Sequence, residues 1–211
     1  MQRDIASSIK STPEIADIAL WESIMAGDEA AFAKFITKHS KPLFNYGYRL
    51  CDDRDLLKDC IQDIFVEIWN RRHKITGSDK LKWYLFKSLR NHIFREQAKK
   101  LRNEPLKDDY DFIIEFDVEY HLIINDEEQE LALKVKKTLE YLPPRQKEVV
   151  YLRYFEGLTF DDIADIMDIS KQSAHNLLQK SYKTFREKWD VCPHTLVPAS
   201  TYLYFLSLII K

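Results

Sequence analysis

The sequence predicts an all-α protein: two helical domains joined by an acidic linker. Apolar residues recur at every fourth position through residues 53–70, which is the period of a buried helix face. Only four of the 211 residues are glycine, too few for a turn-rich β fold or a Gly-rich phosphate loop. The helical pattern breaks at Glu104-Pro105 and resumes near Asp126, so we expect two small domains rather than one.

The charges are segregated along the chain, although the formal net charge is only −2. Residues 80–102 carry eight Lys or Arg and one acid, whereas residues 103–130 carry eleven acids and one base. Solvated helix faces would carry mixed signs. The segregation therefore favours a DNA-facing surface followed by a separate linker.

Several classes of protein are disfavoured by the sequence. Its three cysteines, Cys51, Cys60 and Cys192, have no metal-type spacing and form no even disulfide set. The N-terminus lacks a cationic-then-apolar signal pattern, and no apolar run approaches the roughly 18–20 residues of a membrane span. The six histidines are scattered, with no catalytic constellation around them. We therefore expect a cytoplasmic protein that is not an enzyme and has no cofactor, metal or small-molecule substrate.

The first domain is expected over residues 15–102. A short amphipathic helix covers 16–25, and Gly27-Asp28 restarts the chain. Residues 28–50 form one or two further helices. The apolar residues expected to point inward from them are Phe32, Phe35, Ile36, Leu43, Phe44 and Tyr48.

Residues 53–70 give the cleanest helical pattern. Apolar pairs repeat from Leu56-Leu57 to Ile68-Trp69 and form one buried stripe. The opposite face carries the polar residues Asp55, Asp59, Gln62, Asp63 and Glu67. A polar loop over 71–80 and a second long helix from Leu81 to about Arg102 follow.

The linker, residues 103–126, has no sustained period. Its apolar residues, which include Phe112, Ile113 and Leu122, are too many for a simple tether. We expect them to dock on a domain or on a partner.

The second domain is expected over residues 127–190. A first helix ends at Pro143, a second runs from 146 to 155, and Gly157 supplies a left-handed turn. Thr159 and Asp162 form a capping box for a short helix, and Ser170 caps the last helix, 171–189. Its buried stripe consists of Ala174, Leu177, Leu178, Ser181 and Phe185. Two short helices joined by a tight turn in this way form a helix-turn-helix.

Three stretches together resemble a known family. "LPPRQKEVVYLRYFEGLTFDDIADIMDISKQSAHNLLQKSYKTFREKW" (142–189) resembles region four of the extracytoplasmic-function group of bacterial RNA polymerase sigma factors. "DLLKDCIQDIFVEIW" (55–69) resembles the core of region two, and "WYLFKSLRNHIFREQAKK" (83–100) resembles the promoter-melting helix that follows it. They cover roughly three quarters of the chain, in the order of the family.

The resemblance implies three sets of functional residues. The first would bind the polymerase clamp and comprises Asp55, Asp59, Gln62, Asp63 and Glu67. The second would contact minus-ten DNA and comprises Trp83, Lys87, Arg90, Asn91, Arg95, Lys99 and Lys100. The third would contact minus-thirty-five DNA and comprises Lys171, Gln172, Ser173, His175, Asn176 and Lys180. In an arbitrary protein, each set would more often be a solvated helix face.

Within these sets, some roles stay open. Trp83 is the best candidate to stack on an unpaired base, and the loop 71–80 would receive a flipped base. Asn91 either reads a base edge or caps a neighbour. The family often has a basic residue where His175 stands, so a charged contact there is in doubt at neutral pH.

The resemblance also implies partners: core RNA polymerase, promoter DNA and an anti-sigma factor, often membrane-anchored. The alternative is a stand-alone helix-turn-helix regulator with an N-terminal helical sensor domain. The apolar C-terminal extension, 191–211, departs from the family. It is either packed on a domain or serves as a lid or partner-binding segment.

Overall fold

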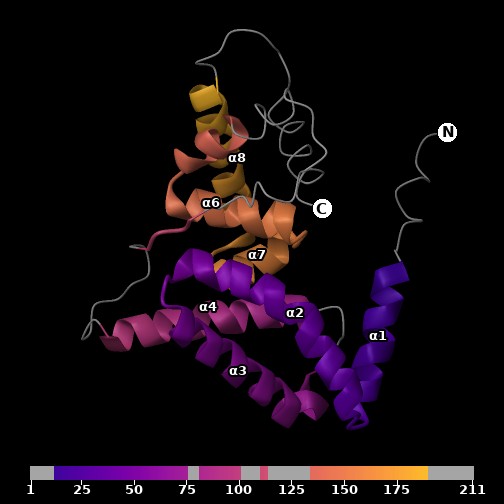
Figure 1. Cartoon of the computed structure of the whole chain (residues 1–211). Coiled ribbons are helices and arrows are strands. Elements are labelled where there is room, and N and C mark those ends of the chain that lie inside the picture. The colour runs from indigo at the N-terminus through magenta and orange to yellow at the C-terminus, as the bar shows by residue number, and fades with distance from the viewer. Residues whose placement is uncertain (1–11, 76–80, 101–109, 114–133, 190–211) are drawn as a thin grey trace, which may run out of the picture. The chain divides into compact units, whose positions relative to one another are not determined.

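The structure is a computed structural model that describes residues 12–75, 81–100, 110–113 and 134–189 (Figure 1). The chain divides into two compact units, Met1–Lys100 (unit 1) and Leu101–Lys211 (unit 2). In the described ranges all regular secondary structure is helical, which confirms the predicted all-α class.

In its described residues, unit 1 contains four α-helices and a short 3₁₀ turn. They are α1 (Thr12–Met25), α2 (Glu29–Leu50), α3 (Arg54–Arg71), η1 (Arg72–Lys74) and α4 (Leu81–Lys100). Asp28 caps α2 by accepting hydrogen bonds from the amides of Ala30 and Ala31, and Asp53 caps α3 through the amide of Leu56. These side chains satisfy amides that the first helical turn leaves without a partner, and so they determine where each helix begins.

The core of unit 1 lies where α2, α3 and α4 meet. Gly47 of α2 lies so close to Leu57 of α3 that a Cβ atom at this position would collide with the leucine side chain. Leu89 and Ile93 of α4, both fully buried, lie on the same spot. A side chain at this position would force the buried Leu57 to shift, and glycine lets the helices pack closely here without that change.

The sequence predicted one or two helices over residues 28–50, and the structure has one continuous helix, α2, with Pro42 inside it. Of the residues expected to point inward, Phe35 and Leu43 are buried, at 3% and 0% exposure. The remaining four are only half-buried: Phe32, Ile36, Phe44 and Tyr48. The apolar stripe of α2 is therefore wider than the face that its neighbouring helices cover.

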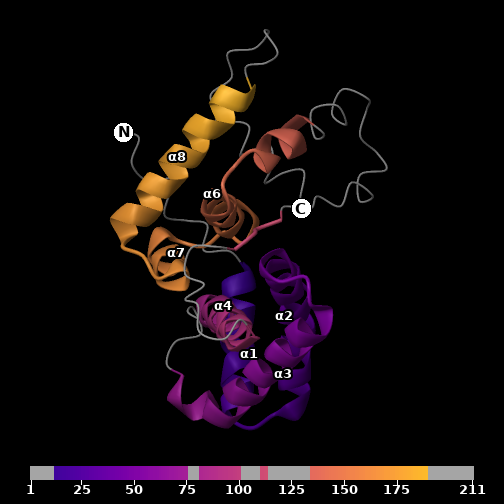
Figure 2. The same ribbon diagram turned by 90° about the vertical axis from the view of Figure 1, so that its left-hand side faces the viewer.

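Unit 2 contains the predicted helix-turn-helix. Its described elements are a helical segment over 134–140, α6 (Pro144–Val150), a π-helical turn η4 (Tyr151–Phe155), α7 (Phe160–Met167) and α8 (Lys171–Trp189). The helix expected over 146–155, with Pro144 at a first helical position, begins at Pro144. It widens into the π turn at its end, a detail that apolar periodicity does not report. In Figure 2, α7 lies beside the N-terminal end of α8.

The predicted caps of unit 2 are present. Gly157 has a φ of +67°, Thr159 and Asp162 form the capping box, and the Ser170 hydroxyl accepts a hydrogen bond from the amide of Ser173 at 3.0 Å. Asp168, which ends α7, also takes a left-handed conformation, with a φ of 53°. Aspartate tolerates this conformation better than most residues, and it turns the chain directly into α8.

Part of the expected linker belongs to unit 2. Tyr110 and Phe112 are buried, at 8% and 1% exposure, and Phe112 packs against Tyr151. Of the two possibilities for the apolar linker residues, docking on a domain therefore holds for Phe112. The expected extension over 191–211 and the linker residues 114–126 lie outside the described residues.

Candidate functional site

The five residues predicted to bind polymerase line one face of α3. Asp55, Asp59, Gln62 and Asp63 are exposed and Glu67 is half-buried, whereas Leu57, Ile61 and Ile64 point into the core. Capping by Asp53 sets the rotation at which this helix starts. We call these five residues the acidic face.

Members of the acidic face differ in their neighbours. The Asp55 carboxylate lies 3.1 Å from the ammonium of Lys58, and the Glu67 carboxylate lies 2.7 Å from the guanidinium of Arg71. Among the described residues, Asp59 and Asp63 form no ion pair within 4.0 Å. Their carboxylates are therefore the ones most ready to accept charge-assisted hydrogen bonds from a basic partner.

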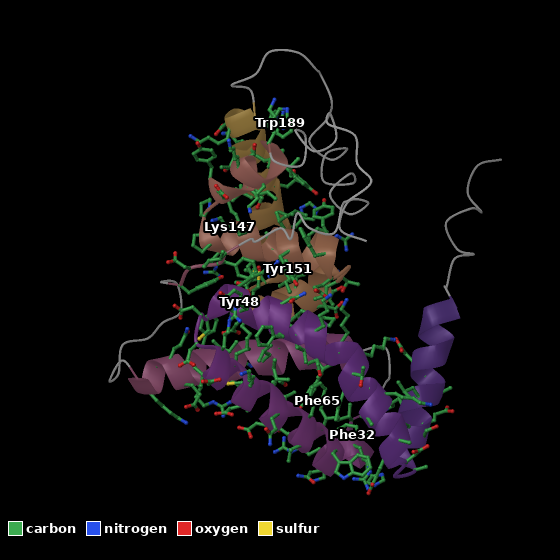
Figure 3. The ribbon with its side chains drawn as sticks, in the orientation of Figure 1. Phe32, Tyr48, Phe65, Lys147, Tyr151 and Trp189 are labelled. Atoms are coloured by element: carbon green, nitrogen blue, oxygen red, sulfur yellow. The ribbon has the colours of Figure 1, made fainter. Side chains whose placement is uncertain are left out.

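An apolar groove of about 830 Å³ adjoins the acidic face, between α2 and α3. The apolar side chains along it are Phe32, Ile36, Phe44, Ile61, Phe65, Val66 and Trp69. Figure 3 labels Phe32 and Phe65, whose ring centroids lie 6.4 Å apart. Val66 is 53% exposed, and Gln62 belongs to both the groove and the acidic face. The two features thus form one continuous surface.

The groove was not predicted from the sequence, which assigned Phe32, Ile36 and Phe44 to the core. A signal was present: α2 carries more apolar residues than one helix–helix contact buries. The exposed Val66 on α3 was a second signal, because it falls between polar positions and outside the buried stripe.

On α4, five of the seven residues predicted to contact DNA fall on one stripe. They follow each other at intervals of four: Trp83, Lys87, Asn91, Arg95 and Lys99. Asn91, Arg95 and Lys99 are exposed, and the Lys87 ammonium lies 5.0 Å from the centroid of the half-buried Trp83 ring. Lys99 also binds Glu96 at 2.6 Å, and this hydrogen bond lowers the pKa of Glu96. The stripe joins one aromatic ring to a row of donors.

The other two predicted residues of α4 stand apart from this stripe. Arg90 is 6% exposed, and its guanidinium carbon lies 4.4 Å from the centroid of the Phe94 ring. A buried guanidinium packed on a ring is poorly placed to meet a phosphate, so we leave Arg90 out of the DNA contacts proposed below. The side chain of Lys100 lies outside the described part of the structure.

On α8, all six residues predicted to contact DNA are exposed. Ala174, Leu178, Ser181 and Phe185 are buried as predicted, while Leu177 is half-buried. The exposed set is Lys171, Gln172, Ser173, His175, Asn176 and Lys180. The N-terminal half of the helix therefore presents a continuous polar surface.

Most of these side chains already have a neighbour. Lys171 binds Asp161 of α7 at 2.8 Å, and the Gln172 amide nitrogen donates to the Asn176 carbonyl oxygen at 2.9 Å. His175 packs on Phe160 of α7, with ring centroids 4.8 Å apart. These contacts hold the polar surface in place before any ligand arrives.

The described residues offer little for other chemistry. They contain no group of three or more His, Cys, Asp or Glu that could hold a metal ion. Burial lowers the pKa of His39 to about 4 and raises the pKa of the Cys60 thiol to about 11, so both are neutral near pH 7. Within the same ranges, no helix is long and apolar enough to cross a membrane.

Two family models match the chain. "Sigma-70 region 2" matches residues 35–103, and "Sigma-70, region 4" matches residues 132–185. The first includes α3 with its acidic face and α4, and the second includes α6, α7 and most of α8. All of the residues predicted to contact polymerase or DNA lie inside these matches, whereas the groove begins before the first match, at Glu29 and Phe32.

Curated relatives with similar sequences are sigma factors by name. The ECF RNA polymerase sigma-E factor of Haemophilus influenzae is 24% identical over 165 residues, which cover 74% of this chain and 85% of that protein. RNA polymerase sigma-H factor of Pseudomonas aeruginosa is 24% identical over 162 residues, covering 72% and 82%. ECF RNA polymerase sigma factor SigK of Mycobacterium bovis is 22% identical over 177 residues, covering 82% and 93%.

One solved structure is similar in fold: CnrH in complex with the cytosolic domain of CnrY. The TM-score is 0.52 and the sequences are 18% identical, over 83% of this chain and 98% of that chain. At this identity the likeness concerns the fold alone.

Proposed function

We propose that three surfaces of this chain, which belongs to the extracytoplasmic-function group of sigma-70 factors and is an RNA polymerase sigma factor, each carry out one part of promoter recognition. The acidic face and the groove bind core polymerase, α4 contacts minus-ten DNA, and α8 contacts the minus-thirty-five element. The observation that carries this proposal is that the acidic face, the stripe on α4 and the polar surface of α8 all lie within the two sigma-70 matches and project away from the cores of their units. The stand-alone regulator is set aside because both matches are to sigma-70 regions.

The polymerase-binding surface combines two kinds of contact. Acids in a row along α3 suit Arg and Lys on a partner, and the adjoining groove suits apolar side chains on the same partner. A helix or coiled coil with one basic and one apolar face fits both. Phe32, Phe65 and Trp69 would then supply the apolar centre of the interface, where aromatic residues contribute most.

On α4, the stripe suits single-stranded DNA. Lys87, Arg95 and Lys99 would meet phosphates, and Trp83 would stack on an unpaired base, a contact worth about 1–3 kcal/mol. The ring nitrogen of Trp83 is buried without a hydrogen-bond partner in the described structure, so the ring offers its face rather than its donor. Asn91 lies midway along the stripe, where it can reach a base edge.

On α8, the N-terminal turns suit the major groove of duplex DNA. Gln172 and Asn176 carry paired donors and acceptors of the kind that recognise adenine, and Lys180 lies farther along, toward phosphates. Lys171, Ser173 and His175 complete the surface. His175, packed on Phe160, would contribute shape rather than charge.

A regulatory partner is also proposed. CnrH, which is similar in fold, was solved in complex with the cytosolic domain of another protein, CnrY. By the same likeness, an anti-sigma factor that is itself membrane-anchored would hold this chain until a signal arrives. The chain would then act in the cytoplasm, where polymerase and promoter meet.

In vitro transcription tests the proposal. Purified protein and core polymerase are incubated with a library of templates that carry randomised upstream DNA, and the transcript starts are sequenced. We expect starts at a defined distance from a two-part motif, and none with core alone. Starts that do not depend on the added protein, or tight operator binding by the protein without core, would overturn it.

A further inference from the structure

Residues 110–113, in the middle of the expected linker, are held against unit 2. The side chains alternate: Tyr110 and Phe112 are buried, at 8% and 1% exposure, while Asp111 and Ile113 are exposed. This is the period of an extended chain with one face on a core. We call Tyr110 and Phe112 the anchor.

The anchor makes two specific contacts. The Phe112 ring lies 5.8 Å from that of Tyr151, which itself stacks on Phe155 at 5.1 Å (Tyr151 is labelled in Figure 3). The Tyr110 hydroxyl donates a hydrogen bond to the carboxylate of Glu148, a residue with 0% exposure. A buried carboxylate needs such a donor, and a buried ring needs its neighbours, so the anchor is part of the core of unit 2.

The anchor shortens the connection between the two units. Nine residues, 101–109, separate Lys100 of α4 from Tyr110. Whatever their conformation, they span at most about 35 Å. Without the anchor, the connection would run from Lys100 to Lys134, the first described residue of the next helix, and would span up to about 120 Å.

The anchored connection is short compared with the separation that a promoter demands. Minus-ten and minus-thirty-five elements are centred about 25 base pairs apart, or about 85 Å along B-DNA. α4, which carries the proposed minus-ten contacts, is about 30 Å long. From the start of α4 to the anchor the chain therefore spans about 65 Å at most, and the body of unit 2 between the anchor and α8 must cover the rest. Three more base pairs add about 10 Å to the distance that has to be covered.

We propose that Tyr110 and Phe112 are specificity-determining residues that set the longest spacer between the two promoter elements that the protein accepts. The inference rests on the proposed function, because it requires α4 and α8 to bind the two elements at once. It predicts an asymmetry. Shorter spacers leave the connection slack and are unaffected by the anchor, whereas longer spacers are limited by it.

The test uses the full chain with core polymerase on a promoter selected by the wild-type protein. Its spacer is varied from three base pairs shorter to three base pairs longer. With Phe112→Ala, transcription from the longest spacer, relative to the selected one, should rise several-fold, while relative transcription from the shortest spacer stays the same. Ile113→Ala, an exposed neighbour in the same segment, is the matched control and should behave as wild type.

A pair of insertions keeps the test valid if Phe112→Ala fails to fold. Six Gly and Ser residues are inserted after Lys107, inside the anchored connection, or after Val118, beyond the anchor. The first insertion should relieve the limit on long spacers several-fold. The second should not, because the anchor excludes residues 114–133 from the connection.

The outcomes distinguish a failure of the anchor's role from a failure of the proposed sigma-factor function. Equal effects of the two insertions, no effect of either, or relief at short and long spacers alike would overturn the role of the anchor while leaving the sigma-factor function intact. If even the wild-type protein directs no transcription at the selected spacing, the proposed function fails, and this inference fails with it.

Discussion

Removing the two aspartates of the acidic face that lack an ion-pair partner should weaken polymerase binding without unfolding unit 1. The change is Asp59→Ala together with Asp63→Ala. Both side chains are exposed on α3, opposite Leu57, Ile61 and Ile64 of the core. Alanine has a higher helix propensity than aspartate, so the helix itself should persist.

The size of the effect follows from the state of the two carboxylates. A hydrogen bond to a charged group contributes about 1.5–3 kcal/mol, so losing two costs about 3–6 kcal/mol. Since 1.4 kcal/mol corresponds to a factor of ten, the Kd for core polymerase should rise by roughly 100-fold to 10,000-fold. Asp55 and Glu67 should each cost less, because Lys58 and Arg71 already occupy them.

The assay is a fluorescence titration of labelled protein with core polymerase, with thermal unfolding followed by circular dichroism as the check on folding. Glu140→Ala with Asp165→Ala is the control, since it removes the same charge from exposed positions of unit 2. A folded Asp59/Asp63 variant with unchanged Kd would refute the reasoning. An equal loss of affinity in the control variant would also refute it, because the effect would then depend only on net charge.

Three further predictions concern other parts of the chain. His39 has a pKa of about 4 in the folded protein against 6.5 for an ordinary histidine, so the unfolded state binds more protons between these two pH values. The free energy of unfolding should therefore be full above pH 6.5 and fall by about 2 kcal/mol by pH 5. Denaturant titrations of His39→Gln should lack this part of the pH dependence. Gln172→Ala and Asn176→Ala should relax base preference at one or two upstream positions by about 1–3 kcal/mol each, whereas Lys180→Ala should weaken binding to all promoters alike and reduce the slope of log affinity against log salt concentration by about 1. Selection on a randomised upstream element with each variant tests this, and identical base preferences in all variants would mean that α8 does not read sequence there. Deleting Pro193–Lys211 should change solubility, stability or inhibition but leave transcript starts in place, because both family matches end before it; starts that move would refute this.

Burial along α3 and α8 could be predicted because it depends on a local period. When apolar residues recur at about every fourth position of a helix, the sequence shows which face is buried and which faces solvent. Capping residues such as Asp53 and Ser170 then determine where the helix starts. On α4 the same reasoning was incomplete. The basic block identified a DNA-facing helix, but Arg90 is one position away from the stripe that joins Lys87 to Asn91, and its side chain turns to Phe94.

Contacts between distant segments could not be predicted, because no period reports them. The groove exists because α2 has more apolar surface than α3 and α4 cover, and the sequence does not say how many neighbours a helix has. The anchor is similar: Phe112 was visibly too apolar for a tether, but its partner Tyr151 lies 39 positions away in the sequence. Composition indicated that such residues dock, and only the fold shows on what.

The three surfaces differ in how much binding energy each of their charges can contribute, because most of those charges already have a neighbour. Lys171, Lys99 and Glu67 are already paired with Asp161, Glu96 and Arg71, respectively, and each gives up this pair when it binds DNA or polymerase. The net gain in free energy is therefore only the difference between two ion pairs at the protein surface. Such side chains are held in position in advance, which reduces the entropy lost on binding but also reduces the net gain. Carboxylates without an ion-pair partner in the described structure, such as those of Asp59 and Asp63, exchange only water for a partner. Affinity for polymerase should therefore depend on a few positions of α3, while the paired residues of α4 and α8 contribute mainly geometry.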